Sequence, residues 1–204
     1  MRSLVIWLCL CVDVSEGWGK VGHEIVGNLA YELLSKEAKS AVDDLLDVEV
    51  LKESETTMGA VASWADKVRF TSEFHWTTPL HYVDIRDVDM KDGCVSPEKC
   101  HFEYKRDCTH DMCAVAAISD ISSLLTSHLR GKSQLNKITK KQALKFLIHF
   151  IGDIHQPLHV SRQSDRGGNE IHVSLPIKPQ DFCIMNEIGP LYHRLICTSF
   201  GMIS

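Results

Sequence analysis

Ala143–His159, ALKFLIHFIGDIHQPLH, is the stretch that decides the expected fold. Its apolar residues recur every three or four positions, which is the spacing of one face of an α-helix. Just upstream, Thr139 and Gln142 have the spacing of a capping box, which predicts where the helix begins. Pro157 cannot continue a helix, so the helix should end before it. The stretch therefore predicts a buried helix around which a mainly helical protein is organised.

Two potential metal ligands lie on this apolar helix. His149 and Asp153 are four residues apart, so a helix points both from the same face. Because an unpaired buried charge is costly, one such pair by itself is most simply a hydrogen-bonded pair in the core. His159, just beyond the break, adds a third potential ligand. Three ligands around one helix end favour a metal site, provided that other parts of the chain supply partners.

The composition is that of a soluble globular protein. The chain has 204 residues, of which 44% are hydrophobic and 24% are charged, enough for one domain with a sizeable core. Its net charge of −5 argues against a broad basic surface that binds nucleic acid. A phosphodiester substrate would therefore need its charge neutralised locally, and bound metal cations would do this.

The N-terminus has the pattern of an export signal. One positive residue precedes a short apolar run, Leu4–Val12, which is too short to span a bilayer. Small residues at Ser15 and Gly17 predict cleavage after Gly17, so that residues 1–17 are a signal peptide and Trp18 is the new N-terminus. An uncleaved N-terminal helix is the alternative. We expect the protein in the secretory pathway, ending outside the cell or in the vacuole or a compartment derived from the endoplasmic reticulum.

Six cysteines remain after residues 1–17 are removed, and an exported protein should pair them as disulfides. Four of them fall between positions 94 and 113, where we expect two local disulfides of undetermined connectivity. A four-thiolate zinc site is the alternative, but the paired C-x-x-C spacing that it needs is absent. The six are Cys94, Cys100, Cys108, Cys113, Cys183 and Cys197.

Helical periodicity is also present elsewhere in the chain. The expected helices are His23–Leu34 with Ile25, Val26, Leu29, Leu33 and Leu34 on its apolar side, a helix capped by Ser35 that ends at Leu46, Thr57–Val68, and Met112–Leu129. The other expected features are a loop with extended pieces over Thr71–Asp89, a turn at Gly167 and Gly168, and a short strand over Ile171–Leu175. The predicted class is all-α, mainly helical, with long loops that carry function.

Further potential ligands, His23, Asp66 and His81, lie at predicted helix ends and in loops. The free amino group of a processed Trp18 could chelate a metal together with its own carbonyl oxygen. Imidazole and carboxylate ligands without thiolate favour zinc, with manganese or iron as alternatives. The ligands outnumber the four that one tetrahedral zinc needs, so we expect a carboxylate that bridges two ions. The segment HEIVG lacks the second His of H-E-x-x-H, which disfavours a single-zinc peptidase.

Five motifs, in this order, resemble those of the plant and fungal trinuclear zinc nucleases, and most of all the plant bifunctional nucleases. They are WGKVGHEIV, ASWADKVR, PLHYVD, FLIHFIGDIHQPLH and GGNEIHV, and the resemblance runs from Trp18 to about Leu175. It implies a phospholipase C/zinc nuclease-like helical domain over residues 18–175. It also implies a secreted endonuclease that cuts single-stranded DNA and RNA to 5′-phosphate ends and removes the phosphate of 3′-nucleotides.

The resemblance implies a ligand set for each zinc. The residues implied for the first zinc are Asp66, His81, His149 and Asp153. Those implied for the second zinc are Asp153 as the bridge, His23, and the amino nitrogen and carbonyl oxygen of Trp18. A water or hydroxide between these two ions would attack phosphorus, and Asp66 would help to orient it.

The resemblance also implies how substrate is held. Tyr82 would stack on a base, and Asp84 and Asn169 would hydrogen-bond the nucleotide. Arg69 stands where fungal members carry a Lys near the phosphate, and it would neutralise charge there. Taken alone, Tyr82 and Asp84 would be an ordinary packed tyrosine and a solvated or capping aspartate. We expect a monomer without stable membrane association.

After Leu175 the chain departs from the family pattern. Residues 176–204 form a divergent tail that lacks the N-L-H-x-x-W-D motif of relatives, and His193 is not followed by Trp-Asp, so it does not replace the missing ligand. A third zinc would keep one protein ligand of three, His159, and the domain would be incomplete at the C-terminus. We interpret the tail as the product of truncation or alternative splicing. Two alternatives to an active nuclease are a zinc-dependent phospholipase C-type hydrolase and an inactive truncated isoform.

Overall fold

The computed structural model describes residues 18–49, 51, 55–86, 101–126 and 137–171. The chain divides into two units, residues 1–170 and 171–204, and all described residues except Ile171 belong to the first. The predicted signal peptide and divergent tail lie outside the described residues, as do positions 172–175 of the predicted strand.

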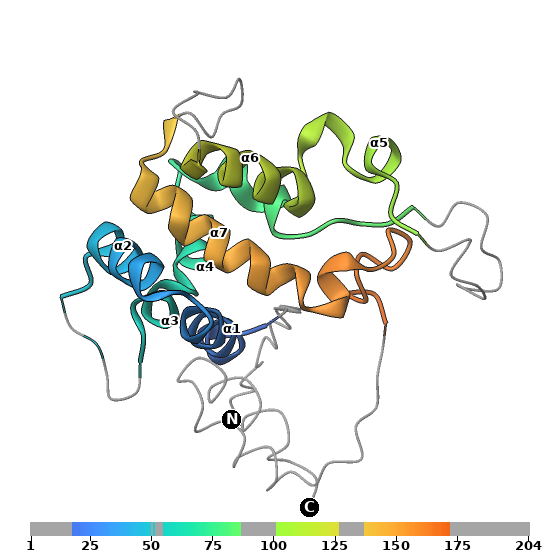
Figure 1. Cartoon of the computed structure of the whole chain (residues 1–204). Coiled ribbons are helices and arrows are strands. Elements are labelled where there is room, and N and C mark those ends of the chain that lie inside the picture. Colours follow the sequence, from blue (N-terminus) through green and yellow to red (C-terminus); the bar gives the residue numbers. More distant parts are fainter. Residues whose placement is uncertain (1–17, 50, 52–54, 87–100, 127–136, 172–204) are drawn as a thin grey trace, which may run out of the picture. The chain divides into compact units, whose positions relative to one another are not determined.

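Helix α7, Lys140–Ile154, is the central element of the first unit. Its start confirms the predicted capping box: Thr139 Oγ1 accepts from the Gln142 amide at 3.2 Å, and Gln142 Oε1 accepts from the Thr139 amide at 2.8 Å. The helix ends three residues before Pro157, which begins the 3-10 turn η4, Pro157–Val160. Figure 1 shows α7 in orange, running between α6 and the group formed by α1, α2, α3 and α4.

The remaining elements are helical as well, which confirms the predicted all-α class. They are α1 (Lys20–Glu32), α2 (Lys36–Leu46), α3 (Thr57–Val61), α4 (Trp64–Val68), η1 (His75–His81), α5 (Tyr104–Asp107), η2 (Thr109–Asp111) and α6 (Ala114–Thr126). Among the described residues, β pairing is limited to one isolated parallel bridge between Ile85 and Arg162. No helix within the described ranges is long and apolar enough to span a bilayer.

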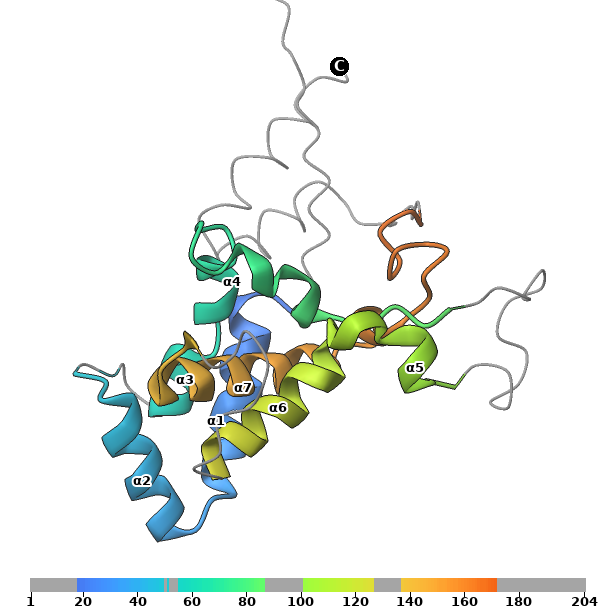
Figure 2. The same cartoon turned by 90° about the horizontal axis from the view of Figure 1, so that it is seen from above.

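The core lies on both sides of α7 (Figure 2). On one side Phe146 and Phe150 pack with Ile121 of α6 and with residues of α4 and η1, and all three are fully buried. On the other side Ile148 packs with Leu46 of α2 and with residues of α3. A helix with apolar residues on both flanks needs cover on both, and the surrounding helices supply it.

The predicted helix Thr57–Val68 is wrong as a single element. The structure breaks it at Ala62 and Ser63 into α3 and α4. The Ala62 carbonyl oxygen accepts a hydrogen bond of 2.6 Å from His149 Nδ1 on α7, so this carbonyl is held by a side chain rather than by a helix amide. The break therefore serves to orient His149, and local periodicity carries no signal of it.

Three of the five residues predicted for the apolar side of the first helix are exposed. Helix α1 begins at Lys20 rather than at His23, and its buried residues are His23 and Gly27. Ile25, Leu29 and Leu33 are 61%, 63% and 81% exposed. Gly27 lies against α3, where an added Cβ would come within 3.0 Å of the Met58 carbonyl oxygen. The close helix contact at Gly27 thus selects the buried face. Ile25, Leu29 and Leu33 face away from it, whereas Leu34 is half-buried against the core.

The loops differ from prediction in smaller ways. Over Thr71–Asp89, residues 75–81 form η1 and residues 82–86 are mainly extended, so the expected loop contains a helical turn. Cys108 and Cys113 form a disulfide, which confirms one local pair. The other four cysteines lie outside the described residues. The turn predicted at Gly167 and Gly168 is present, and both glycines have positive φ.

Candidate metal centre and adjoining pocket

Five side chains from four separate elements converge beside α7. His149 and Asp153 come from the same face of α7, as their spacing predicts, and both are buried. His23 of α1 stacks on His149, with ring centroids 3.9 Å apart. His81 ends η1, and Asp66 lies in α4. Four of the five are almost fully buried, and Asp66 keeps 34% of its side chain exposed.

Four ligand-type atoms of this cluster lie close together. His81 Nδ1 is 3.1 Å from His149 Nε2 and 3.0 Å from Asp153 Oδ2. His149 Nε2 is 3.3 Å from Asp153 Oδ2 and 3.5 Å from Asp66 Oδ1. The distance between His81 Nδ1 and Asp66 Oδ1 is 3.7 Å. These atoms surround one small volume.

These distances fit a tetrahedral metal ion. Zinc binds imidazole nitrogen and carboxylate oxygen at about 2.0–2.2 Å, which places the corners of a tetrahedron about 3.3–3.6 Å apart. The five separations span 3.0 to 3.7 Å. A cation at the centre would also relieve the repulsion between the lone pairs of these two imidazole nitrogens and two carboxylate oxygens. The donor set of imidazole and carboxylate oxygen without thiolate is one that suits zinc.

Backbone carbonyls orient two of the histidines. His149 Nδ1 donates to the Ala62 carbonyl oxygen, so in the neutral ring the lone pair is on Nε2, which faces the cluster. His159 Nδ1 donates to the His81 carbonyl oxygen at 2.7 Å, which likewise leaves Nε2 as the ligand atom. A carbonyl partner on the far nitrogen is the usual way in which proteins fix a metal-binding imidazole.

The second oxygen of Asp153 faces another set of groups. Asp153 Oδ1 is 3.3 Å from His23 Nε2 and 3.7 Å from His159 Nδ1. Its two oxygens thus serve different sides of the cluster, as a bridging carboxylate requires. Gly152 makes room for this arrangement, because a Cβ there would lie 2.6 Å from His23 Nδ1.

The electrostatics of the cluster favour a cation. Burial raises the pKa of Asp153, but hydrogen bonds from His149, His23 and His81 outweigh burial and hold that pKa far below its ordinary value. Burial lowers the pKa of His149, yet hydrogen bonds to Asp153 and Asp66 raise it to about 9. The pKa of His81 is lowered, chiefly by burial. Without metal, the charge of two ionised carboxylates is met mainly by a proton on His149.

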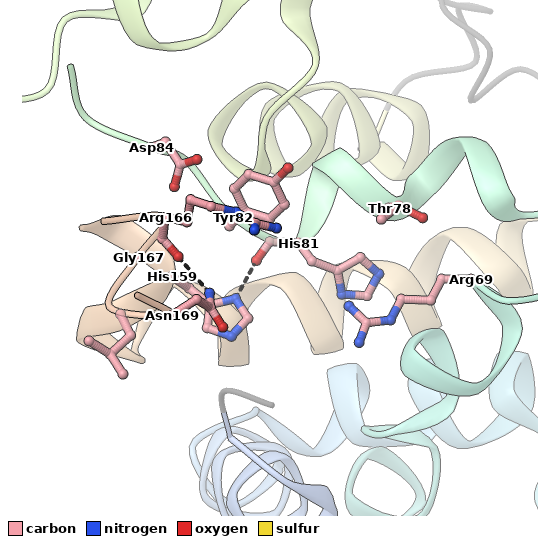
Figure 3. Close-up of a pocket in the computed structure, with 10 residues that line it drawn as sticks. Arg69, Thr78, His81, Tyr82, Asp84, His159, Arg166, Gly167 and Asn169 are labelled. Atoms are coloured by element: carbon pink, nitrogen blue, oxygen red, sulfur yellow. Dashed lines mark hydrogen bonds between the residues drawn. The ribbon is translucent and has the colours of Figure 1, made fainter. Parts of the chain in front are cut away.

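A pocket of about 300 Å³ opens directly beside His81 (Figure 3). Its wall is the extended segment after η1, which pairs with the segment after α7: Val83 N donates to His159 O at 2.8 Å, and Ile85 N to Ser161 O at 2.7 Å. Alternate residues of an extended segment point to opposite sides. Val83 is buried against the Cys108–Cys113 disulfide, so Tyr82 and Asp84 point to the pocket.

The pocket contains every substrate residue that the sequence predicts. Its lining includes Tyr82, Asp84, Asn169 and Arg69, together with the cluster residue His81 and with His159. Burial raises the pKa of Asp84, and the neighbouring Asp165 adds to this, while Arg166 opposes it. Burial likewise raises the pKa of Tyr82. The volume is at the lower end of the range of about 300–1,000 Å³ usual for small-molecule sites.

Sequence reasoning misses Arg166, which also lines the pocket. The one sequence signal near it is the Gly167–Gly168 pair that follows. In the structure Arg166, Gly167 and Gly168 all have positive φ, at 53°, 66° and 84°. Positive φ is unusual for a non-glycine residue, and such residues are often found at functional sites.

Three other residues of the sequence motifs lie as follows. Arg69, the residue after α4, places Nε 3.6 Å from Asp66 Oδ1, and Figure 3 shows its side chain reaching toward His81. Trp18 lies just before α1, with its ring over Gly22, where an added Cβ would lie 2.6 Å from the indole. His155, which lies inside the motif FLIHFIGDIHQPLH, is exposed and donates from Nδ1 to the Ile151 carbonyl oxygen at 2.6 Å.

Comparison with known proteins agrees with this geometry. The S1/P1 Nuclease family model matches residues 18–182 of the chain. The chain belongs to this family. The match to S1/P1 nucleases begins at Trp18 and includes every residue of the cluster and of the pocket.

Three curated relatives show how far the similarity extends. Endonuclease 2 of Arabidopsis thaliana is 36% identical over 85% of this chain and 56% of its own length. Nuclease S1 of Aspergillus oryzae is 34% identical over 79% of this chain and 50% of its length. Nuclease P1 of Penicillium citrinum is 34% identical over 77% of this chain and 52% of its own length. The chain thus spans about half the length of the curated relatives it matches.

Proposed function

We propose that this protein is a zinc-dependent endonuclease that hydrolyses single-stranded DNA and RNA to 5′-phosphate ends and removes the phosphate of 3′-nucleotides. The observation that carries the proposal is the position of an aromatic pocket directly beside a cluster of metal-ligand atoms. His81 belongs to both, so a nucleotide in the pocket would have its phosphate at the cluster. The family membership and the names of the relatives support a nuclease activity.

In this proposal the cluster holds two zinc ions. Asp66, His81, His149 and Asp153 hold the first, and their atom separations fit one tetrahedral ion. Asp153 would also contribute to the second, since its Oδ1 faces His23, and His23 and a processed Trp18 would be the other ligands there. His159 is the residue available to a third ion. When bound, zinc lowers the pKa of water and neutralises the charge of a phosphate in the transition state.

The chain's own residues position the substrate. The exposed ring of Tyr82 offers a surface for a base, and stacking of this kind is worth about 1–3 kcal/mol and tolerates any base. It requires an unstacked base, which gives a physical reason for a preference for single strands. Arg69 neutralises phosphate charge near Asp66. The pKa of Asp66 is lowered because His149 and Arg69 outweigh its burial, so its carboxylate is ionised. It would accept a hydrogen bond from the attacking water and so orient it.

We further propose that residues 1–17 are removed on export and that the mature monomer acts in the secretory pathway or outside the cell. The family match begins at Trp18, which supports this cleavage position. In the same proposal residues 18–175 form the nuclease domain and residues 176–204 a divergent tail. The N-terminal sequence of protein purified from a secreting host tests the cleavage directly.

The decisive experiment measures zinc and hydrolysis on the same sample. Protein purified from a secreting host is analysed for zinc by mass spectrometry and then incubated with single-stranded DNA, duplex DNA and phosphatidylcholine, each with and without a chelator. We expect about two zincs per chain and chelator-sensitive cleavage of the single strand. Protein without zinc would refute the proposal, and hydrolysis of phosphatidylcholine instead of DNA would identify a phospholipase.

A further inference from the structure

Arg166 is a charged residue of the pocket that has no role in the proposed function. Its guanidinium forms no hydrogen bond or salt bridge with any residue that the structure describes, and the residue is exposed. Figure 3 shows its side chain extending from the glycine turn across the pocket toward Tyr82, with Asp84 nearby. Arg166, Tyr82 and Asp84 line the same pocket, and the positive charge of Arg166 opposes the rise that burial causes in the pKa values of Tyr82 and Asp84.

The turn that carries Arg166 is held firmly. The Arg166 carbonyl oxygen accepts hydrogen bonds from the backbone amide of Asn169 and from Asn169 Nδ2, at 3.4 and 2.5 Å. Gly168 N donates to Asp165 Oδ1 at 2.8 Å. Gly167 has no room for a side chain, since an added Cβ would lie 2.5 Å from the Leu158 carbonyl oxygen. The backbone therefore fixes the position of the Arg166 Cα atom. It also holds Arg166 at a positive φ, which disfavours any residue with a Cβ.

These contacts place a planar cation and a carboxylate on the wall of one pocket. The guanidinium group only donates hydrogen bonds, and the carboxylate of Asp84 only accepts them when ionised. Guanine is the base with two adjacent acceptors, O6 and N7, and two adjacent donors, N1–H and N2–H. Adenine has a donor at N6 between its acceptors N1 and N7, so it offers neither group a matched pair. Arg pairs with O6 and N7 of guanine through two hydrogen bonds more often than with any other base edge.

We propose that Arg166 is a specificity-determining residue that, together with Asp84, makes the pocket favour guanine over the other bases. This inference rests on the proposed function, because it assumes that the pocket receives a nucleotide base. Tyr82 supplies stacking that does not distinguish bases, and Arg166 supplies the distinction. Asn169 Nδ2 is engaged with the Arg166 carbonyl, which leaves the Asn169 side-chain oxygen as an acceptor for the ligand.

Binding of nucleoside 5′-monophosphates to the full chain, measured by calorimetry above neutral pH, tests the inference. These ligands carry the phosphate of the proposed products and have no 3′-phosphate to lose. We expect dGMP to bind about tenfold more tightly than dAMP, dCMP or dTMP, which is within the discrimination of one bidentate pair. Arg166→Ala should remove the preference by weakening dGMP alone. Arg166→Lys keeps the charge but loses the planar fork, so it should also remove the preference.

Arg162→Ala is the matched control, because Arg162 lies in the same turn but its side chain pairs with Asp165 and does not line the pocket. It should retain the preference for dGMP. Equal affinities for all four nucleotides in the unsubstituted protein would overturn the inference, and so would an Arg166→Ala variant that weakens all four equally. Hydrolysis of single-stranded DNA is measured in parallel. Cleavage without base preference leaves the proposed function intact, whereas selective dGMP binding without cleavage refutes only the proposed function.

Discussion

Helices α7 and α1 each bring a histidine to the same cluster, but they differ in what else they bury. On α7 the residues that flank His149, Ile148 and Phe150, are buried with it. On α1 only His23 and Gly27 are buried, and the i,i+4 row of Val21, Ile25, Leu29 and Leu33 is exposed. Helix α7 thus combines a fully buried core face with its ligands, whereas α1 adds only the partly buried Ala30 and Tyr31 to the core beside its ligand face.

The difference shows when hydrophobic periodicity identifies a buried face. It succeeds on α7 because the ligands lie between two apolar flanks, both of which have partners. It fails on α1 because a close helix contact at Gly27 and the approach of His23 to Asp153 fix the rotation of the helix. Burial of a ligand against its partners then outweighs the burial of aliphatic side chains, each worth about 1.5–3 kcal/mol.

The largest effect is expected at the residue that joins the two helices. Asp153→Asn keeps the size of the side chain but replaces one carboxylate oxygen, which faces either His23 or the His81–His149 pair, with an amide nitrogen. An amide does not bridge two cations, so we expect single-strand hydrolysis to fall by about a thousandfold or more. The measurement is the initial rate on single-stranded DNA with zinc in excess.

Asp120→Asn is the control for that substitution, because Asp120 is an exposed aspartate of α6 that belongs neither to the cluster nor to the pocket. It should leave the rate unchanged. An Asp153→Asn protein that retains full turnover would remove Asp153 from the catalytic site.

The second effect is a dependence of metal-free stability on pH. The pKa of His149 in the folded protein is about 9, above its ordinary value of 6.5, so its contribution to stability is complete below about 6.5 and is lost as pH rises through 9. The pKa values of Asp66 and Asp153 are lowered, so their contribution is present above 3.8 and is lost only in acid. The melting temperature of chelated protein should therefore fall between pH 6.5 and 9.

Zinc should reverse this trend, because it requires deprotonated imidazoles and its affinity rises with pH. The difference in melting temperature between zinc-loaded and chelated protein should thus widen from pH 6.5 to 9. His149→Gln should abolish the slope of the chelated protein, while His155→Gln, a change at an exposed histidine, should keep it. A slope that survives in His149→Gln would assign the titration to another group.

A third substitution tests the contact between the two helices. Gly152→Ala places a methyl group 2.6 Å from His23 Nδ1, and overpacking of this kind costs about 1–3 kcal/mol. We expect a lower melting temperature and weaker zinc binding, measured by thermal denaturation and by metal analysis. Gly19→Ala adds the same group where no atom lies within 4 Å, so it should leave zinc binding unchanged. Normal zinc binding in Gly152→Ala would show that His23 has room to move.

The same contrast explains how much could be predicted from sequence. The i,i+4 pair on α7, the capping box and the helix end before Pro157 follow from local geometry, so the sequence predicts them. The ligands on other elements are brought in by tertiary contacts. Residue type offers His23, Asp66 and His81 as candidates, and only the resemblance to a family assigns each of them to a particular zinc. The break at Ala62 depends on a hydrogen bond from His149, 87 residues away, which no local pattern encodes. The role of Arg166 in the pocket could not be predicted for a similar reason, since a positive-φ turn sets its position.

The smallest effect is expected on the exposed row of α1. Leu29→Ala removes apolar atoms from a side chain that is 63% exposed, and surface changes of this kind alter stability by about 0.5 kcal/mol or less. Ile148→Ala on α7 is the matched core substitution and should cost about 2–5 kcal/mol. Denaturant unfolding of both variants measures the two free energies. A Leu29→Ala cost as large as that of Ile148→Ala would mean that the row is covered in solution, and α1 would then bury an apolar face as α7 does.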